Sequence, residues 1–110
     1  MAMETARRFT AGLVQMACGP SPEENLGRAM ARIEEAARAG AAVVCLPELF
    51  RYQYFCQRED HACFDLAELV PGPTTDALGK IARQRHVIVI APIFERRAPG
   101  VYHNSAAVID

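Results

Sequence analysis

The sequence predicts an α/β fold with a mixed sheet, in the order strand, helix, strand, loop, helix, strand, strand. The apolar run Ala41–Leu46 is bounded by Gly40 and Pro47, which is typical of a fully buried strand. A capped helix directly precedes this run, and a strand–helix–strand unit of this kind places its two strands parallel. A second strongly apolar run, Val87–Phe94, is followed by Val101–Asp110, and the pair is predicted to form a hairpin.

Size and charge narrow the class of protein. The chain has 110 residues, enough for one domain, with 51% hydrophobic and 23% charged residues, which is a globular composition. Its net charge of -1 predicts neither a nucleic-acid partner nor an anionic membrane. No apolar run approaches the roughly 20 residues of a spanning helix, and no signal-peptide pattern follows the N-terminal residues 1–8, which are expected to form a flexible tail. We therefore expect a cytoplasmic protein.

The first half of the chain carries clear start and stop signals. Residues Phe9–Ala17 are predicted to form the first strand. Ser21 is then a good N-cap, Pro22 suits the first helical position, and Glu24 completes a capping box. Apolar residues recur at helical spacing until Gly40, which ends the helix.

A long connection, Phe50–Pro73, separates the two halves. Its charged part, residues 57–65, is predicted to be a surface segment or a short helical turn. Thr74 or Thr75 is expected to cap the next helix, which ends near a surface His86.

Glu48 is the candidate general base. It comes directly after the buried strand, and ligands bind at the carboxyl edge of open α/β sheets. It lies between Leu-Pro and Leu-Phe, and a carboxylate that loses hydration among apolar groups suits a general base. The alternative is an ordinary solvated turn residue or a partner for a nearby helix.

Other polar groups are candidates for the same site. Arg51, Tyr52 and Tyr54 combine aromatic and polar groups in the loop after Glu48, and such loops often line pockets. They are predicted to bind substrate, although the aromatic rings could equally pack the loop onto the sheet. Asn104 and Ser105 lie inside the last strand and are either hydrogen-bonding groups of a site or ordinary ladder and turn residues.

The cysteines raise the question of a metal. Cys56, His61 and Cys63 are close in sequence, but their spacing fits no common zinc finger and a fourth ligand is not evident. Cys18 and Cys45 fit small core residues. We expect free thiols in a reducing compartment and no metal.

Five short motifs lie along the chain: V-Q-M-A-C at residues 14–18, E-N-L at 24–26, A-G-A at 39–41, L-P-E-L-F at 46–50 and Y-H-N-S-A-A-V-I-D at 102–110. Together they resemble the N-terminal part of the nitrilase, or carbon–nitrogen hydrolase, superfamily. The resemblance covers almost the whole chain after Arg8. Within the superfamily, Y-F-C-Q-R-E-D at residues 54–60 looks most like N-carbamoylputrescine amidases, although β-ureidopropionases and related amidases share much of the framework.

The resemblance implies a four-layer α-β-β-α sandwich, of which residues 1–110 would be a partial domain. It implies a Glu-Lys-Cys catalytic set in which Glu48 is the general base, the Cys attacks a carbamoyl or amide carbon, and the Lys stabilises the oxyanion. It implies a small-molecule carbamoyl or amide substrate, no metal or organic cofactor, and assembly into a homo-oligomer.

The chain departs from the family pattern in its catalytic set. Family members are considerably longer, and their Lys follows the strand that here ends at Asp110. Lys80 lies on a predicted helix surface, and no cysteine has the context of the nucleophile. We therefore expect an N-terminal segment, inactive alone, of an enzyme that converts N-carbamoylputrescine to putrescine, carbon dioxide and ammonia in polyamine biosynthesis.

Three alternatives remain open from the sequence. The chain could belong to a β-ureidopropionase-like or other amidase of the superfamily. It could be a non-catalytic module that binds a full-length homologue. It could be a small metal-binding domain that uses the Cys56, His61 and Cys63 side chains.

Overall fold

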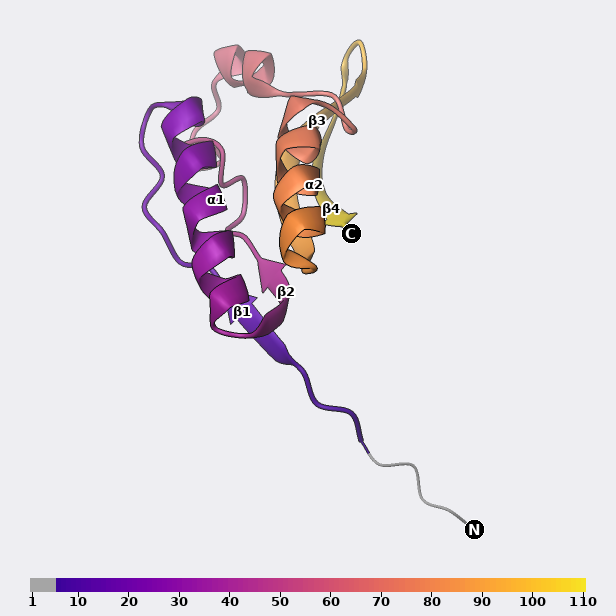
Figure 1. Cartoon of the computed structure of the whole chain (residues 1–110). Helices are drawn as coiled ribbons and strands as arrows, with labels where there is room; N and C mark the ends of the chain where they lie inside the picture. Colours follow the sequence, from indigo (N-terminus) through magenta and orange to yellow (C-terminus); the bar gives the residue numbers. More distant parts are fainter. Residues whose placement is uncertain (1–5) are drawn as a thin grey trace.

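The computed structural model describes residues 6–110 and confirms the predicted order of elements (Figure 1). Of the predicted N-terminal tail, residues 1–5 lie outside the described residues, and residues 6–8 carry no helix or strand. The elements are β1 Thr10–Leu13, α1 Pro22–Arg38, β2 Ala41–Cys45, the 3-10 helix η1 His61–Leu66, α2 Pro73–Arg85, β3 Ile88–Ala98 and β4 Val101–Ile109.

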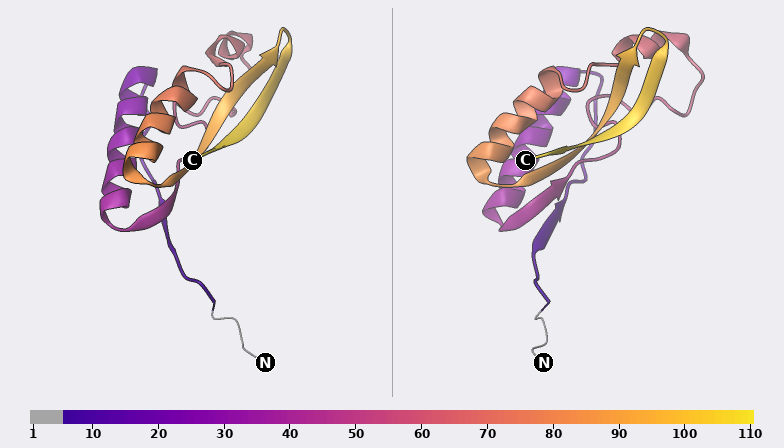
Figure 2. Two further views of the ribbon diagram at one scale, coloured as in Figure 1. Left: turned by 45° about the vertical axis from the view of Figure 1, so that its right-hand side comes forward. Right: turned by 90° about the vertical axis from the view of Figure 1, so that its right-hand side faces the viewer.

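The four strands form one mixed sheet, as predicted, and their order in the sheet is β1-β2-β3-β4. The pairs β1–β2 and β2–β3 are parallel, and β3–β4 is an antiparallel hairpin. Figure 2 shows α1 and α2 side by side on one face of the sheet. The β2 strand is therefore interior, and its carboxyl end opens toward the upper edge of the sheet in Figure 1.

The core lies between the sheet and the two helices. Alternate residues of the strands face the helices, so Val44 of β2 and Val89 of β3 are completely buried. On the helix side they meet residues such as Ile33 and Leu78, also completely buried. The core therefore has one apolar face from each layer, as expected of a sheet packed on helices.

The opposite face of the sheet carries apolar side chains that nothing within residues 6–110 covers. Leu13 of β1 is 82% exposed and Val108 of β4 is 70% exposed. Leu13 pairs with Cys45, and Val108 pairs with Ile90, so these four residues share this face. We call it the open face.

The predicted boundaries of α1 are confirmed, and its first turn is capped as expected. Pro22 is the first residue, and the Ser21 hydroxyl accepts a hydrogen bond from the Glu24 backbone N–H at 3.2 Å. Gly40 has a φ of 95° directly after the helix, a left-handed conformation that glycine adopts without strain.

Three boundaries differ from the sequence prediction. The β1 strand stops at Leu13 instead of Ala17, because its partner β2 ends at Cys45. The cap of α2 is Gly72, and Thr75 acts from inside the helix, where its hydroxyl accepts a hydrogen bond from the Gly72 N–H at 2.8 Å. The hairpin also lengthens β3 to Ala98, because β4 pairs with it over that whole length.

Two glycines predict stability changes of opposite sign. A Cβ on Gly12 would lie 2.9 Å from the Ala36 Cβ, whereas one on Gly27 would meet nothing within 4 Å. Gly12→Ala should therefore lower the free energy of unfolding by about 1–3 kcal/mol through overpacking of β1 against α1. Gly27→Ala should raise it by about 0.5–1 kcal/mol because alanine favours the helix. Urea unfolding followed by circular dichroism measures both, and equal signs would contradict the packing described here.

Candidate active site

Glu48 lies where the sequence predicted, just past the carboxyl end of the interior strand β2. The turn that begins at Glu48 contains Leu49 with a φ of 50°, a left-handed conformation that is strained for a branched side chain. Leu49 and Phe50 are buried, and their packing holds this conformation. The turn thus points Glu48 away from the core while its two neighbours anchor the backbone.

The prediction that Glu48 lies among apolar side chains is wrong for the part of the chain that the structure describes. Glu48 is exposed, although both residues that follow it are buried. The physical reason is the turn: consecutive side chains diverge, so apolar neighbours in sequence do not become neighbours in space.

Asn104 is the direct partner of Glu48. Its Nδ2 donates a hydrogen bond to Glu48 Oε1 at 3.0 Å, across 56 positions of sequence. Asn104 lies on β4 directly opposite Phe94 of β3, in register with the open face. Sequence reasoning marked Asn104 as a possible hydrogen-bonding group but favoured a ladder role. The available sequence signal was the position of Asn104: the alternation of side chains along the strand places this polar residue on the open face, among apolar residues.

Tyr54 is the second group beside Glu48. The Glu48 carboxylate raises the pKa of the Tyr54 hydroxyl, because a nearby negative charge disfavours a phenolate. The Cys56 side chain adds to this shift of the Tyr54 pKa through its charge and its hydrogen bond. Glu48, Asn104, Tyr54 and Cys56 therefore form one cluster past the end of β2.

This cluster predicts a measurable titration change. Glu48→Gln removes the charge with the largest influence on Tyr54, so the pKa of Tyr54 should fall toward the ordinary value near 10. Absorbance titration at 295 nm, with Tyr54→Phe to assign the signal, measures the shift. Glu68→Gln is the matched control, because Glu68 lies beside Tyr52. An unchanged Tyr54 titration in Glu48→Gln would show that the two groups are not close.

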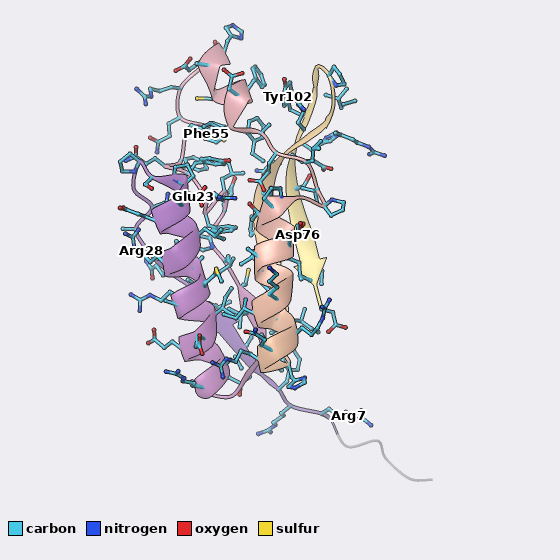
Figure 3. All side chains as sticks on the ribbon, turned by 45° about the horizontal axis from the view of Figure 1, so that its top comes forward. Arg7, Glu23, Arg28, Phe55, Asp76 and Tyr102 are labelled. Atoms are coloured by element: carbon cyan, nitrogen blue, oxygen red, sulfur yellow. The ribbon has the colours of Figure 1, made fainter. Side chains whose placement is uncertain are left out.

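Arg51, one of the predicted substrate-binding residues, is engaged elsewhere. Its side chain donates to Glu23 Oε1 at 2.8 Å, to the Pro22 carbonyl at 3.4 Å, and to the Thr74 hydroxyl. These partners lie at the N-terminal ends of α1 and α2, and Figure 3 shows Glu23 at the end of α1. Because the Arg51 guanidinium is occupied there, the geometry favours a role for Arg51 in holding the turn that carries Glu48. Contact between Arg51 and the substrate stays a prediction.

Tyr52 also points away from Glu48. Its hydroxyl donates to Glu68 Oε2 at 3.4 Å, and burial, followed by the Glu68 carboxylate, raises the pKa of Tyr52. Glu68 pairs with Glu95 of β3, whose carboxylate binds Ser105 on the helix-covered side of the sheet. Of the three predicted substrate-binding residues, the structure brings only Tyr54 to Glu48.

Sequence reasoning missed the role of Asn25. This completely buried side chain donates to the carbonyls of Gly19 and Arg51 at 2.8 and 2.9 Å and accepts from the Gly19 N–H at 2.8 Å. It joins the loop after β1, the start of α1 and the turn after β2. A polar residue on the inner face of a helix was the only sequence signal.

The remaining candidates have no place in the cluster. Within residues 6–110, no group of three or more His, Cys, Asp or Glu side chains is arranged to hold a metal, so the Cys56, His61 and Cys63 hypothesis lacks the required geometry. Lys80 is exposed on α2, as predicted. Glu48 is thus the one member of the implied Glu-Lys-Cys set that lies in its expected context among the described residues; Cys56 is near this edge but lacks the context of the nucleophile.

The fold agrees with the sequence comparison. Residues 10–110 match the carbon–nitrogen hydrolase family, and the chain belongs to that family. It is 36% identical over 104 residues to N-carbamoylputrescine amidase of Oryza sativa, covering 94% of this chain and 34% of that protein. It is 33% identical over 98 residues to a citrullinase of Francisella tularensis, covering 89% and 34% respectively. Omega-amidase NIT2 of Xenopus tropicalis is 34% identical over 101 residues, which cover 92% and 35%.

Solved structures show the same fold. A carbon–nitrogen hydrolase from Helicobacter pylori superposes with a TM-score of 0.82 at 36% identity, over 89% of this chain and 34% of that one. A CN-hydrolase superfamily protein from Xanthomonas campestris superposes with a TM-score of 0.77 at 21% identity, over 94% and 37%, and supports the fold alone. The chain spans about a third of the length of these relatives.

Proposed function

We propose that this chain supplies the general base of a carbon–nitrogen hydrolase, and that Glu48 is that base. The observation that carries the proposal is the Glu48 carboxylate past the end of the interior strand β2, accessible from the open face and oriented by Asn104 at 3.0 Å. A carboxylate that is both oriented and accessible can take a proton from a group that approaches it.

The proposed reaction needs two further groups, a nucleophilic Cys in the context that the family pattern gives it, which Cys56 lacks, and an oxyanion-stabilising Lys. Glu48 takes the thiol proton as the Cys sulfur bonds to the carbamoyl or amide carbon. The proton passes to the leaving amine as the carbon–nitrogen bond breaks, which leaves a thioester. Glu48 then takes a proton from water, whose oxygen displaces the thiol. The chain alone is therefore expected to be inactive.

The substrate class that we propose is a carbamoyl amine, with N-carbamoylputrescine as the representative. Support comes from the Y-F-C-Q-R-E-D segment and from the relative of that name in Oryza sativa. The citrullinase relative makes citrulline, another carbamoyl amine, a competing candidate, and the omega-amidase relative makes small amides a competing class. No helix within residues 6–110 is long and apolar enough to cross a membrane. A small polar substrate and free cysteines fit our proposal of a cytoplasmic enzyme in polyamine biosynthesis.

A pair of chimeras tests the proposed function. Residues 10–110 replace the matching third of the Oryza sativa amidase in one chimera and of the Francisella tularensis citrullinase in the other. We expect release of putrescine or hydrolysis of citrulline, respectively, with the larger fraction of parental activity retained in the amidase host. Folded chimeras that are both inactive would overturn the catalytic proposal. Greater retention in the citrullinase host would overturn N-carbamoylputrescine as the representative substrate but not the class, because citrulline is also a carbamoyl amine.

The open face predicts self-association of the chain when it is studied alone. Leu13 and Val108 expose apolar surface that the further layers of a four-layer sandwich would cover. We expect sedimentation velocity to detect dimers or larger species, and the double variant Leu13→Gln, Val108→Gln to shift them toward monomer. A wild-type chain that stays monomeric at high concentration would contradict this prediction.

A further inference from the structure

A cavity of about 350 Å³ lies between η1, the loop before it and the far end of β3. Its apolar walls are the rings of Phe55, Phe64 and Phe94 and the side chains of Cys56 and Cys63. The other lining residues are polar or charged: Arg58, Glu59, Asp60 and His61. Figure 3 places the labelled Phe55 at this end of the molecule, where η1 approaches the β3–β4 hairpin that carries Tyr102. The volume falls at the small end of ligand pockets, which are roughly 300–1,000 Å³.

The aromatic rings that form the cavity walls pack against neighbouring rings. The ring centroids of Phe55 and Phe94 are 5.1 Å apart, and those of Phe64 and Tyr102 are 4.6 Å apart. Both distances are typical of favourable aromatic pairs. Phe64 nevertheless stays 43% exposed, so the cluster leaves apolar surface unfilled. An apolar cavity with rigid walls is suited to a hydrocarbon group.

The cavity is next to Glu48. Phe94 forms a wall of the cavity and lies directly opposite Asn104, the residue that binds Glu48 Oε1. Side chains directly opposite in an antiparallel pair have Cβ atoms about 4.5–5.5 Å apart. Phe94 is therefore the side chain that lies between the cavity and the Glu48–Asn104 pair. Cys56, another wall residue, contributes with Glu48 to the raised pKa of Tyr54.

The charges at the mouth of the cavity do not favour an anionic ligand. Arg58 and His61 lie there beside the acidic Glu59 and Asp60, and all four are exposed. The three rings offer no hydrogen bond to a carboxylate that enters between them, and burying an unpaired charge is costly. An aliphatic chain meets no such cost, and an ammonium at its end could stay in water beside Glu59 and Asp60.

We propose that this cavity is the subsite for the hydrocarbon segment of the substrate hydrolysed at Glu48. The inference rests on the proposed function and narrows it to carbamoyl amines and amides that carry an aliphatic chain, as against short amides that end in a carboxylate. Phe64 and Cys63 are then specificity-determining residues, because they form walls of the cavity without belonging to the Glu48 cluster.

Ligand-detected NMR on the 110-residue chain tests this subsite, because saturation-transfer difference spectra tolerate self-association. The probes are n-butylurea, a neutral carbamoyl amine with a four-carbon chain, and succinamate, an amide that ends in a carboxylate. We expect saturation of the butyl protons of n-butylurea, greatest at the terminal methyl, and at least a fivefold smaller effect for succinamate.

Three variants locate the binding. Cys63→Phe fills the cavity and should abolish the n-butylurea signal. Phe64→Ala removes one wall and should weaken binding about fivefold, which corresponds to the lost burial of one or two methylene groups. Leu13→Gln, on the open face, should leave the signal unchanged. Circular dichroism checks that each variant keeps its helices.

Three outcomes would overturn the inference. These are no saturation by n-butylurea, equal saturation by succinamate, and loss of signal in Leu13→Gln but not in folded Cys63→Phe or Phe64→Ala. Binding of n-butylurea to the chain requires neither the nucleophilic Cys nor the Lys, so a negative binding result does not decide the outcome of the chimera activity experiment. Conversely, an inactive chimera with normal n-butylurea binding would overturn the proposed reaction but not the cavity.

Discussion

Glu48→Gln should lower the kcat of the Oryza sativa chimera by about 10²–10⁴, the usual contribution of a general base. The substitution keeps the size of the side chain and an oxygen that can accept the Asn104 hydrogen bond, which is 3.0 Å long in the structure. It removes only the ability to take a proton from the thiol and from water. Steady-state kinetics with N-carbamoylputrescine measure the loss, and KM should change little because the base does not hold the substrate.

Glu95→Gln is the matched control for this experiment. Glu95 is also a carboxylate near the end of a strand, and it accepts a hydrogen bond from Ser105 at 2.8 Å. It lies on the helix-covered side of the sheet, away from Glu48, so kcat should stay within about twofold. A Glu48→Gln chimera with kcat within tenfold of its parent would remove Glu48 from the role of base.

The fold was predictable because local signals agreed with one another along the chain. Ser21 and Pro22 start α1, Gly40 ends it, and the apolar run that follows has the length of a buried strand. The hairpin was also predictable, because two apolar runs are separated by a turn that contains Gly100 with a φ of 77°. Such signals act over a few residues and need no knowledge of the tertiary structure.

The site was only partly predictable. The position of Glu48 followed from the strand before it, but its partner Asn104 is 56 residues away and depends on the order of strands in the sheet. Tyr52 and Tyr54 looked equivalent in sequence, yet the chain turns between them, so one binds Glu68 and the other lies beside Glu48. Hydrogen-bond partners of this kind are set by tertiary structure, and residue type alone does not distinguish them.

Asn25 joins the start of α1 to the turn that carries Glu48, a role that sequence reasoning did not assign to it. Its side chain satisfies both backbone groups of Gly19 and the carbonyl of Arg51, three residues after Glu48. Arg51 in turn binds Glu23, the Pro22 carbonyl and Thr74. The strained turn at Leu49 is therefore held on its C-terminal side by bonds to both helices, and losing Asn25 would release that side.

Asn25→Ala should lower the free energy of unfolding by about 3–5 kcal/mol, because it leaves three backbone groups without partners in a buried place, at roughly 1–3 kcal/mol each with partial relaxation. Urea unfolding of the 110-residue chain, followed by circular dichroism, measures the loss. Asn104→Ala is the matched control, since this exposed residue should change stability by less than about 0.5 kcal/mol. Asn25→Asp keeps an acceptor for the Gly19 N–H but loses both donated bonds and sets a buried carboxylate against two carbonyl oxygens, so it should lower stability at least as much as Asn25→Ala. Equal effects of Asn25→Ala and Asn104→Ala would mean that the buried amide does not hold these segments together.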